Sequence, residues 1–424
     1  MTDHPPRAAL PDHGTDWETL CARMDEMATG DVKWRDGKTA VYVFNAGEDV
    51  ARVQRHAYTR FMSENGLGPM AFPSLARMER EIVEMALSLL NAPEGAAGNV
   101  TSGGTDSITM AIKTARDHAR ATGRLAPGAR ANLVLPWSAH PAFDKAAALM
   151  DMEIRRIPCT EDYLADPEAM GAAADANTIM IVGSAPCFPY GLVDPIAALG
   201  EVAEAQGLWL HVDACVGGFF APFARMNGVH LPAFDFSVPA VKSMSADLHK
   251  YGYCAKGAST VLFRSEDLRA HMVFDTGDWP GGRMITPTLA DTRPGGAIAA
   301  AWAVMNYLGV DGYREKQGLV VETREKIEAG VKALGFSIIG APQLGLLGYT
   351  HPDRDMFAIW GKLHERGWFT SVVTKPKGIH LMLSPKHAEV ADTYLADLAW
   401  ATEQVEAESA AKGAGPEREI RYSG

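Results

Sequence analysis

Hydrophobic residues recur along the chain at two different spacings, and the spacing changes near residue 100. Before that point, apolar residues repeat every three to four positions, which predicts helices over about Trp17–Met27, Glu48–Asn65 and Leu75–Leu90. After it, short apolar runs alternate with stretches of helical spacing. The predicted strands are ANLVLPW (131–137), TIMIVGSAP (178–186), LWLHVDAC (208–215), VPAVKSM (238–244) and ASTVLFRS (258–265). Strands separated by helices predict a mostly parallel sheet with helices on both faces.

The pattern changes again after a segment rich in glycine and proline at 276–296. A long apolar helix is predicted at 297–309, and the remainder mixes helices with strands. These later helices are predicted at 323–335, 355–367 and 388–407, and the strands at 336–340 and 378–385. At 424 residues the chain exceeds one small core. We predict an α/β fold with an N-terminal arm and helices at 1–65, a large domain at 66–310 and a small C-terminal α+β domain at 311–424.

Composition narrows the class of protein. Apolar residues make up 47% of the chain and charged residues 22%, which is typical of a globular protein. A net charge of −12 with no basic stretch argues against a nucleic-acid partner. No run approaches the roughly 18 apolar residues of a membrane span, and the first residues lack the apolar core of a signal peptide. Five scattered cysteines without a C-x-x-C pair indicate reduced thiols and no metal site, as expected for a cytoplasmic protein.

Polar residues follow several of the predicted strands at the point where each strand ends. They are Ser102–Thr105, His140, Ser184, Asp213 and the turn around Lys250. In an open parallel sheet, ligands bind at the carboxyl ends of the strands. The sequence therefore predicts a small-molecule site where these five segments meet.

The segment TSGGTDSITMAIK (101–113) combines two glycines and a threonine with the start of a helix. Free amide groups at a helix N-terminus, with glycines that permit close approach, form an anion site suited to a phosphate group. A helix start capped by Ser or Thr is the structural alternative. The segment has neither the Gly-Lys-Ser ending of a P-loop nor the GxGxxG pattern of a dinucleotide site.

Asp213 and Lys250 add two further groups to this phosphate site. An aspartate that ends an apolar strand is costly to bury unpaired, and a protonated ring nitrogen would offset that cost; a helix N-cap is the alternative. A lysine partly desolvated in a pocket loses basicity and can form an imine with an aldehyde; a lysine extended to solvent is the alternative. His249 could donate to a phosphate. A phosphate site, a carboxylate for a pyridine nitrogen and an imine-forming lysine are what pyridoxal 5'-phosphate requires.

Five segments carry a more specific signal: FPSLARMEREIV, TSGGTDSITMAIK, GSAPCFPYGLVDPI, HVDACVGGFFAPF and SADLHKYGYCAKGASTVLFRS. Through them the chain resembles the fold type I pyridoxal-phosphate enzymes of the group II decarboxylase family, most closely the branch of sphingosine phosphate lyases. The resemblance runs from about residue 40 to about residue 400. It implies a pyridoxal-phosphate-dependent transferase-like fold and a homodimer with shared active sites. The segment 276–296, with Arg293, would then make the contact between subunits.

The resemblance assigns roles around the cofactor ring, position by position. Lys250 would form the imine with the cofactor, and Asp213 would pair with the pyridine nitrogen. His140 would stack on one face of the ring, and Cys215 would pack against the other. Ser184 would lie near the ring hydroxyl. Lys250, Asp213 and His140 are therefore the expected catalytic residues.

The resemblance also assigns the cofactor phosphate and part of the substrate site. Gly104, Thr105 and His249 would hold the phosphate. Lys256 matches a lysine that the lyases keep near the active site. Tyr42 would correspond to an N-terminal tyrosine that reaches it. Both would contact the substrate, an amine or amino acid.

The chain departs from the family pattern at substrate-facing positions. Where the lyases have an Asn-Pro-Leu-His-Pro-Asp stretch, this chain reads NGLGPMAFPS (65–74), and Met284 stands where they have a tyrosine. No tyrosine occurs between Tyr253 and Tyr307, although aromatic amino acid decarboxylases use one on a mobile loop there. We therefore expect a carbon–carbon lyase that cleaves a β-hydroxy amine, phosphorylated or not, to an aldehyde and a smaller amine. The alternative is an α-decarboxylase of an amino acid; a silent binding subunit is disfavoured because Lys250 and Asp213 are present.

Overall fold

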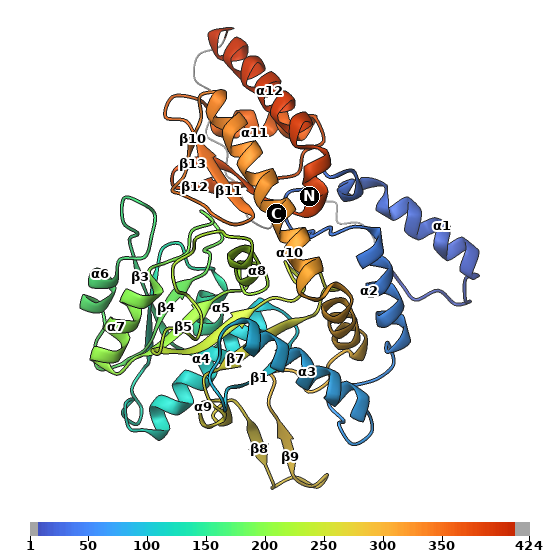
Figure 1. Cartoon of the computed structure of the whole chain (residues 1–424). Coiled ribbons are helices and arrows are strands. Elements are labelled where there is room, and N and C mark those ends of the chain that lie inside the picture. Colours follow the sequence, from blue (N-terminus) through green and yellow to red (C-terminus); the bar gives the residue numbers. More distant parts are fainter. Residues whose placement is uncertain (1–6, 412–424) are drawn as a thin grey trace.

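A seven-stranded sheet forms the centre of the large domain, and the computed structural model describes residues 7–411 of the chain (Figure 1). The strands lie in the order β1-β7-β6-β5-β4-β2-β3. Their bounds are β1 (Ala97–Thr101), β2 (Asn132–Pro136), β3 (Glu153–Ile157), β4 (Thr178–Ser184), β5 (Trp209–Asp213), β6 (Val241–Ala246) and β7 (Ser259–Phe263). Neighbouring strands from β6 to β3 are parallel, whereas β7 runs antiparallel to β1 and β6. The predicted mostly parallel sheet is confirmed.

Helices cover both faces of this sheet because both faces of its strands are apolar. Leu133 of β2 belongs to one buried cluster with α4 and α5, and its neighbour Val134 belongs to another with α7 and α8. Met180 and Ile181 of β4 divide between the two clusters in the same way. The helices are α4 (Gly104–Ala121), α5 (Ala142–Leu149), α6 (Pro167–Ala172), α7 (Ile196–Gln206), α8 (Ala221–Met226) and α9 (Glu266–Ala270).

The small domain is built on a four-stranded antiparallel sheet, in the order β10-β11-β13-β12. Its strands and helices are β10 (Ser337–Ile338), β11 (Leu346–Thr350), α11 (Met356–Glu365), β12 (Ser371–Thr374), β13 (Lys377–Met382), η3 (Pro385–Glu389) and α12 (Ala391–Ala411). Helix α10 (Gly295–Ala333) runs from the large domain into it, with a kink at Gly309, whose φ is 54°. The limits of 66–310 and 311–424 stay predictions, and the kink lies beside the boundary between them.

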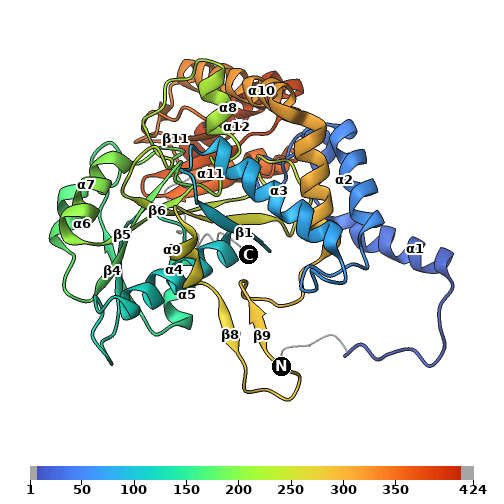
Figure 2. The same ribbon diagram turned by 60° about the horizontal axis from the view of Figure 1, so that its bottom comes forward.

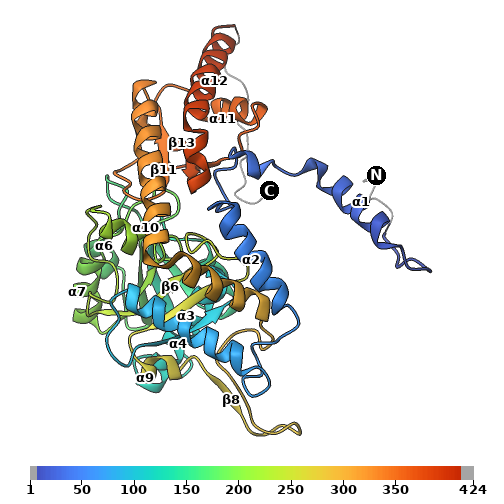
Figure 3. The same ribbon diagram turned by 45° about the vertical axis from the view of Figure 1, so that its right-hand side comes forward.

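The N-terminal part links the two domains. Helices α2 (Glu48–Arg60) and α3 (Pro73–Leu89) pack on α10, and residue Thr39 pairs with Phe369 of the small domain. Helix α1 (Trp17–Met27) contains no buried residue and projects from the body of the subunit (Figure 3). The short helices η1 (Ala28–Gly30) and η2 (Trp34–Asp36) follow it. No helix in the described part of the chain is long and apolar enough to cross a membrane.

Several predicted elements have the expected bounds, and others differ for identifiable reasons. The first helix is confirmed at Trp17–Met27, and the third begins at Pro73, a residue suited to the first helical turn. The second ends at Arg60, five residues earlier than predicted. The helix predicted at 297–309 continues through its Gly309 kink to Ala333, so it merges with the one predicted at 323–335.

The strands that the sequence pattern did not indicate are short, partly exposed or interrupted by charge, except for the buried β11 (Leu346–Thr350). They are β1, β3, β11, β12 and the hairpin of β8 (Phe274–Thr276) and β9 (Met284–Thr286). None of the residues of β3 is fully buried, and Arg155 and Arg156 interrupt its apolar pattern. The β8–β9 hairpin extends from the large domain (Figure 2). Pairing with neighbouring strands, not an alternating pattern, forms these elements.

Candidate active site

The carboxyl ends of three central strands bring predicted site residues side by side. The register of the sheet pairs Ser184 of β4 with Asp213 of β5, and Asp213 with Ser245 of β6. The turn that carries Lys250 follows β6 directly, and the Gly103–Gly104 turn follows β1. The site therefore lies at the edge of the sheet where a doubly wound fold places its ligands.

Asp213 is a buried carboxylate, 7% exposed, at the last position of β5. Its Oδ1 accepts hydrogen bonds from the Cys215 backbone N–H at 3.1 Å and from the Ser245 hydroxyl at 3.4 Å. The N-cap alternative is wrong, because the next helix, α8, has Phe220 at its N-cap. Burial lowers the pKa values of His140 and Lys250, and the charge of Asp213 opposes that effect at both residues.

Lys250 is held by a carboxylate that the sequence did not indicate. Its Nζ forms an ion pair with Asp247 Oδ2 at 2.9 Å, and its side chain is 23% exposed. Burial lowers the pKa of Lys250, but the charges around it, chiefly that of Asp247, outweigh burial and raise the pKa above its usual value. The expectation of a lysine with reduced basicity is therefore wrong for this structure. The alternative of a lysine extended to solvent is wrong as well.

The start of α4 packs closely beside this ion pair. Gly103 is the N-cap, and no side chain caps the helix, so the alternative of a Ser- or Thr-capped start is wrong. A Cβ on Gly104 would lie 2.9 Å from both Asp247 Oδ2 and Cys215 Sγ, and one on Gly103 would lie 3.4 Å from His249 Cε1. Glycine is therefore needed at Gly104. Thr105, the second residue of the helix, is exposed.

Several buried polar atoms at this edge of the sheet have no hydrogen-bond partner in the described chain. They are Ser184 Oγ, Asp247 Oδ1 and His249 Nδ1. Buried polar atoms without a partner are rare, so three at one sheet edge indicate a polar ligand. A hydroxyl, an imidazole and free helix amides fit a ring that carries a hydroxyl and a phosphate. Pyridoxal phosphate is such a group, and when bound it withdraws electrons from a bond at the amine-bearing carbon of a substrate.

His140 and Cys215 lie near Asp213 on different elements. The His140 Nδ1 accepts a hydrogen bond from the Ala142 backbone N–H at 3.1 Å, which fixes the orientation of the ring. Burial lowers the pKa of His140, so the ring is neutral at pH 7. Cys215 is 5% exposed, and burial raises the pKa of its thiol, which therefore stays protonated.

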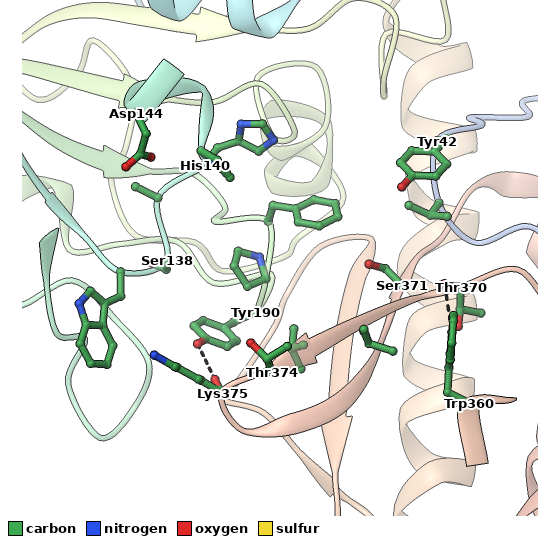
Figure 4. Close-up of a pocket in the computed structure, with 18 of the residues that line it drawn as sticks. Tyr42, Ser138, His140, Asp144, Tyr190, Trp360, Thr370, Ser371, Thr374 and Lys375 are labelled. Carbon is green, nitrogen blue, oxygen red and sulfur yellow. Dashed lines mark hydrogen bonds between the residues drawn. The ribbon is translucent and has the colours of Figure 1, made fainter. Parts of the chain in front are cut away.

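A cleft of about 1270 Å³ opens beside His140, between the large and small domains (Figure 4). Its walls come from the segment before α5, the loop after β4, and β12 with its flanking residues. The residues that line it include Tyr42, Trp137, His140, Phe188, Tyr190, Trp360, Phe369, Thr370, Ser371 and Lys375. The Tyr190 hydroxyl donates to the Lys375 carbonyl at 2.6 Å and joins the two walls at one end of the cleft.

Tyr42 and Lys256, the predicted substrate contacts, occupy different places. Tyr42 lines the cleft, is 46% exposed and has a φ of 62°, which is unusual for a bulky residue. Lys256 does not line the cleft; its Nζ donates to the His249 carbonyl at 3.2 Å and lies 5.2 Å from the Phe44 ring. Burial and the charge of Lys250 lower the pKa of Lys256 to about 8, although its exposed surface lets water weaken both effects.

The sequence-based prediction missed Asp247, Ser245, Asp194 and the small-domain wall of the cleft. Asp247 stands three positions before Lys250, and this spacing within a turn was the available signal. Asp194 is fully buried and accepts N–H groups of Ser184 at 2.8 Å and Ala165 at 2.9 Å. Burial raises the pKa of Asp194 to about 6. No local pattern indicates the β12 wall, because tertiary packing brings it there.

Comparisons with known proteins agree with this geometry. The family described as "Pyridoxal-dependent decarboxylase conserved domain" matches residues 4–350. The sphingosine-1-phosphate lyase of Oryza sativa subsp. japonica is 38% identical over 92% of this chain and 72% of its own length. A probable L-tyrosine/L-aspartate decarboxylase of Methanothermobacter thermautotrophicus is 31% identical over 78% of this chain and 88% of its own length.

A solved structure has the same fold over almost the whole chain. The sphingosine-1-phosphate lyase of Burkholderia pseudomallei superposes with a TM-score of 0.91 at 34% identity, covering 96% of this chain and 95% of that one. Both the expected fold class and the expected cofactor are thereby confirmed. The chain belongs to the pyridoxal-dependent decarboxylase family and is a lyase that depends on pyridoxal phosphate.

Proposed function

We propose that the enzyme cleaves the bond between the amine-bearing carbon and the hydroxyl-bearing carbon of a phosphorylated β-hydroxy amine of the sphingoid type. The products are an aldehyde and a smaller phosphorylated amine. The observation that carries the proposal is the extent of the similarity: relatives named sphingosine-1-phosphate lyase match more than nine tenths of this chain. The similarity is therefore not restricted to the cofactor-binding segments.

The residues at the sheet edge would hold the cofactor by its ring and by its phosphate. The free amides at Gly104 and Thr105 and the imidazole of His249 would bind the phosphate. Asp213 would keep a proton on the ring nitrogen, because a buried carboxylate favours a cation beside it. His140 on one side would fix the plane of the ring.

Other polar groups would complete the contacts with the cofactor ring and would bind the amine of Lys250. Ser184 would donate its hydroxyl hydrogen to the ring oxygen, and Cys215 would lie against the face opposite His140. Lys250 is the amine that would bond to the cofactor. Asp247 would hold its Nζ as an ammonium whenever the substrate displaces it, since the two groups already form an ion pair at 2.9 Å.

The substrate would occupy the cleft, with Tyr42 beside its reacting end. Removal of the proton from the β-hydroxyl requires a polar group near that end, and the Tyr42 and His140 side chains are the candidates within the lining. The phosphate of the substrate would lie beyond the lining of the cleft, where Lys256 would attract it as a point charge, because a lysine with a pKa near 8 is mostly charged at pH 7.

α-Decarboxylation of an amino acid is the competing function, and the decarboxylase of Methanothermobacter thermautotrophicus is the observation that favours it. The donor that aromatic decarboxylases use is a tyrosine after the lysine. In this chain that segment forms the β8–β9 hairpin, where Met284 begins β9 and no tyrosine is present. The cleavage of a carbon–carbon bond next to a hydroxyl is therefore the better-supported reaction.

The test supplies the purified enzyme with two substrate panels. One contains sphingoid bases with and without a phosphate, and the other contains common amino acids. We expect an aldehyde from the phosphorylated base, without carbon dioxide. Carbon dioxide from any amino acid at a comparable rate, with no aldehyde from any base, would reverse the assignment.

Lys256→Ala tests the phosphate contact within the same experiment. We expect kcat/KM to fall roughly ten- to a hundredfold for the phosphorylated base, which corresponds to the loss of one hydrogen bond to a charged group. The unphosphorylated base should react as it does with the wild type. Lys242→Ala is the matched control, because Lys242 lies at the opposite end of β6 from the site. An equal loss on both bases would contradict a phosphate contact.

We also propose that the active form is a homodimer with active sites completed across the interface. Trp17, Met24 and Met27 of α1 are between 50% and 75% exposed, and an isolated helix of this length is marginal in water. Trp279 in the β8–β9 hairpin is 57% exposed. A second subunit that covers both features would account for them.

Arg293 does not fit the predicted role as a contact with the partner. Its side chain is 11% exposed, pairs with Glu79 and donates to the carbonyls of Val100 and Gly66 within its own subunit. The hairpin tip is the better candidate for that contact. Trp279→Ser should weaken the dimer in sedimentation, and a monomer that keeps full activity would contradict the proposal.

A further inference from the structure

A column of polar side chains runs through the interior of the sheet and ends at Asp213. In β5, Trp209, His211 and Asp213 lie on one face, because alternate residues of a strand share a face. In β6, the register places Ser243 beside His211 and Ser245 beside Asp213. None of the five side chains is more than 7% exposed, and three of them are fully buried.

Hydrogen bonds connect these five side chains without a break. Trp209 Nε1–H donates to Ser243 Oγ at 2.7 Å, and Ser243 Oγ lies 2.8 Å from His211 Nδ1. His211 Nε2 lies 3.3 Å from Ser245 Oγ, and the Ser245 hydroxyl donates to Asp213 Oδ1 at 3.4 Å. The two links nearest the carboxylate are the longest, as is common at a site that tightens when its ligand binds.

The groups at the two ends decide which atoms donate and which accept along this series of hydrogen bonds. An indole N–H can only donate, and an ionised carboxylate can only accept. If Ser243 donates to His211 Nδ1, the Nε2 atom carries the hydrogen and donates to Ser245, whose own hydrogen is then available for Asp213. Cys215 is the other neighbour of the Ser245 hydroxyl, but a thiol is a much weaker acceptor than a carboxylate.

We propose that His211, as its Nε2–H tautomer, is a positioning residue that aims the Ser245 hydroxyl at Asp213 and so keeps that carboxylate ionised and oriented toward the cofactor ring nitrogen. The proposal rests on the assignment of Asp213 to that nitrogen and not on the identity of the substrate. Burial lowers the pKa of His211 to about 4, so the ring stays neutral and keeps one hydrogen to direct. A residue present only to fill the core would need neither ring nitrogen; the Phe143 ring, 5.9 Å away, packs against His211 in that way.

The test measures the protonation of the cofactor ring directly. The holoenzyme is reconstituted with pyridoxal phosphate labelled with ¹⁵N in the ring, and the nitrogen chemical shift is recorded for wild type, Ser245→Ala and His211→Phe. We expect both variants to move the shift toward that of an unprotonated pyridine, and kcat to fall about tenfold, which corresponds to one unit of pKa. Phe143→Leu is the matched control, since it alters the packing around His211 but none of the bonds, and should keep the wild-type shift.

Two outcomes would overturn the proposal. Variants that fold, by circular dichroism and thermal melting, but keep the wild-type nitrogen shift would show that Asp213 protonates the ring nitrogen without the hydrogen bonds from His211 and Ser245. If the variants do not fold, long-range ¹H–¹⁵N spectra of wild-type enzyme labelled with [¹⁵N]histidine identify the tautomer of His211, and a hydrogen on Nδ1 would exclude the proposed direction. Neither readout involves the substrate, so failure here leaves the proposed lyase reaction standing.

Discussion

At the scale of single residues, the ion pair of Lys250 with Asp247 decides the charge state of the Lys250 amine. Asp247 is 2% exposed, and burial alone would raise its pKa, but the charges of Lys250 and His249 lower the pKa below its usual value. Both members of the pair are therefore charged at neutral pH. The Lys250 amine is held as an ammonium, and it has no free electron pair for attack as long as its ion pair with Asp247 is intact.

The substitution Asp247→Asn tests this directly. Removing the carboxylate charge leaves Lys250 desolvated, so its pKa should fall by roughly one to three units. The measurement is the pH midpoint of labelling with an amine-reactive reagent in protein stripped of cofactor, read by mass spectrometry of the Lys250 peptide. Exposed Lys33 in the same digest is the internal reference. An unchanged midpoint for Lys250 would mean that Asp247 does not control the amine.

At the scale of elements, the two tyrosines beside Lys250 attach its turn to α10 and to the small domain. The Tyr251 hydroxyl donates to the Leu383 carbonyl at 2.7 Å. The Tyr253 hydroxyl donates to Gln317 Oε1 at 2.9 Å, and Gln317 Nε2 donates back to the Tyr251 carbonyl at 3.0 Å. These contacts explain why Lys250 has aromatic neighbours: their hydroxyl groups tie its turn to α10 and to the small domain.

Tyr253→Phe should therefore destabilise the protein although no carbon atom is lost. It leaves the buried Gln317 Oε1 without a donor, which costs about 1–3 kcal/mol in the free energy of unfolding. Urea denaturation of the holoenzyme measures the change. Tyr307→Phe is the control on the same helix, because the Tyr307 hydroxyl bonds Asp49 only at the surface. A surface change of this kind should stay within about 0.5 kcal/mol, and an equal loss in both variants would contradict the explanation.

At the scale of the whole molecule, three buried histidines make stability depend on pH. Burial lowers the pKa values of His211, His380 and His387 to about 4, and all three are at most 3% exposed. Between pH 4 and about 6.5, the unfolded chain binds protons at these positions that the folded chain does not bind. Their contribution to stability is full above pH 6.5 and is lost as the pH falls toward 4. Asp194, with its pKa raised to about 6, acts in the opposite direction over the same range.

The expected contribution of these four groups at pH 5 is roughly two protons taken up on unfolding, three from the histidines less one from Asp194, or a slope of about 2.7 kcal/mol per pH unit. Urea denaturation at fixed protein and cofactor concentration, repeated from pH 7 to pH 5, measures the slope. His380→Leu should reduce it by about one proton. A slope that is flat or that rises with acidity would show that these histidines are protonated in the folded state.

The sequence by itself determined the inner strands of the large-domain sheet and the position of Asp213 and Lys250 at its carboxyl edge. The strands inside the sheet are almost entirely buried and each carries several apolar residues, so β2, β4, β5, β6 and β7 could be predicted from their residue patterns. Asp213 and Lys250 could be identified because each stands next to such a strand, where the chain order alone fixes their position. Local signals succeed where a feature depends on neighbours in sequence.

Only the tertiary structure decided which groups lie against those residues and where the cleft between the domains opens. The buried hydrogen-bonded side chains from Trp209 to Ser245 act across two strands, and the β12 wall meets the loop after β4 through Tyr190 and Lys375, which are 185 positions apart. Asp247 is close to Lys250 in the sequence, but only the fold of the turn brings the two charges together. The basicity of Lys250 was predicted with the wrong sign for this reason. Burial can be anticipated from an apolar neighbourhood, but the pKa of a buried amine depends on the charges placed around it, and folding alone places them.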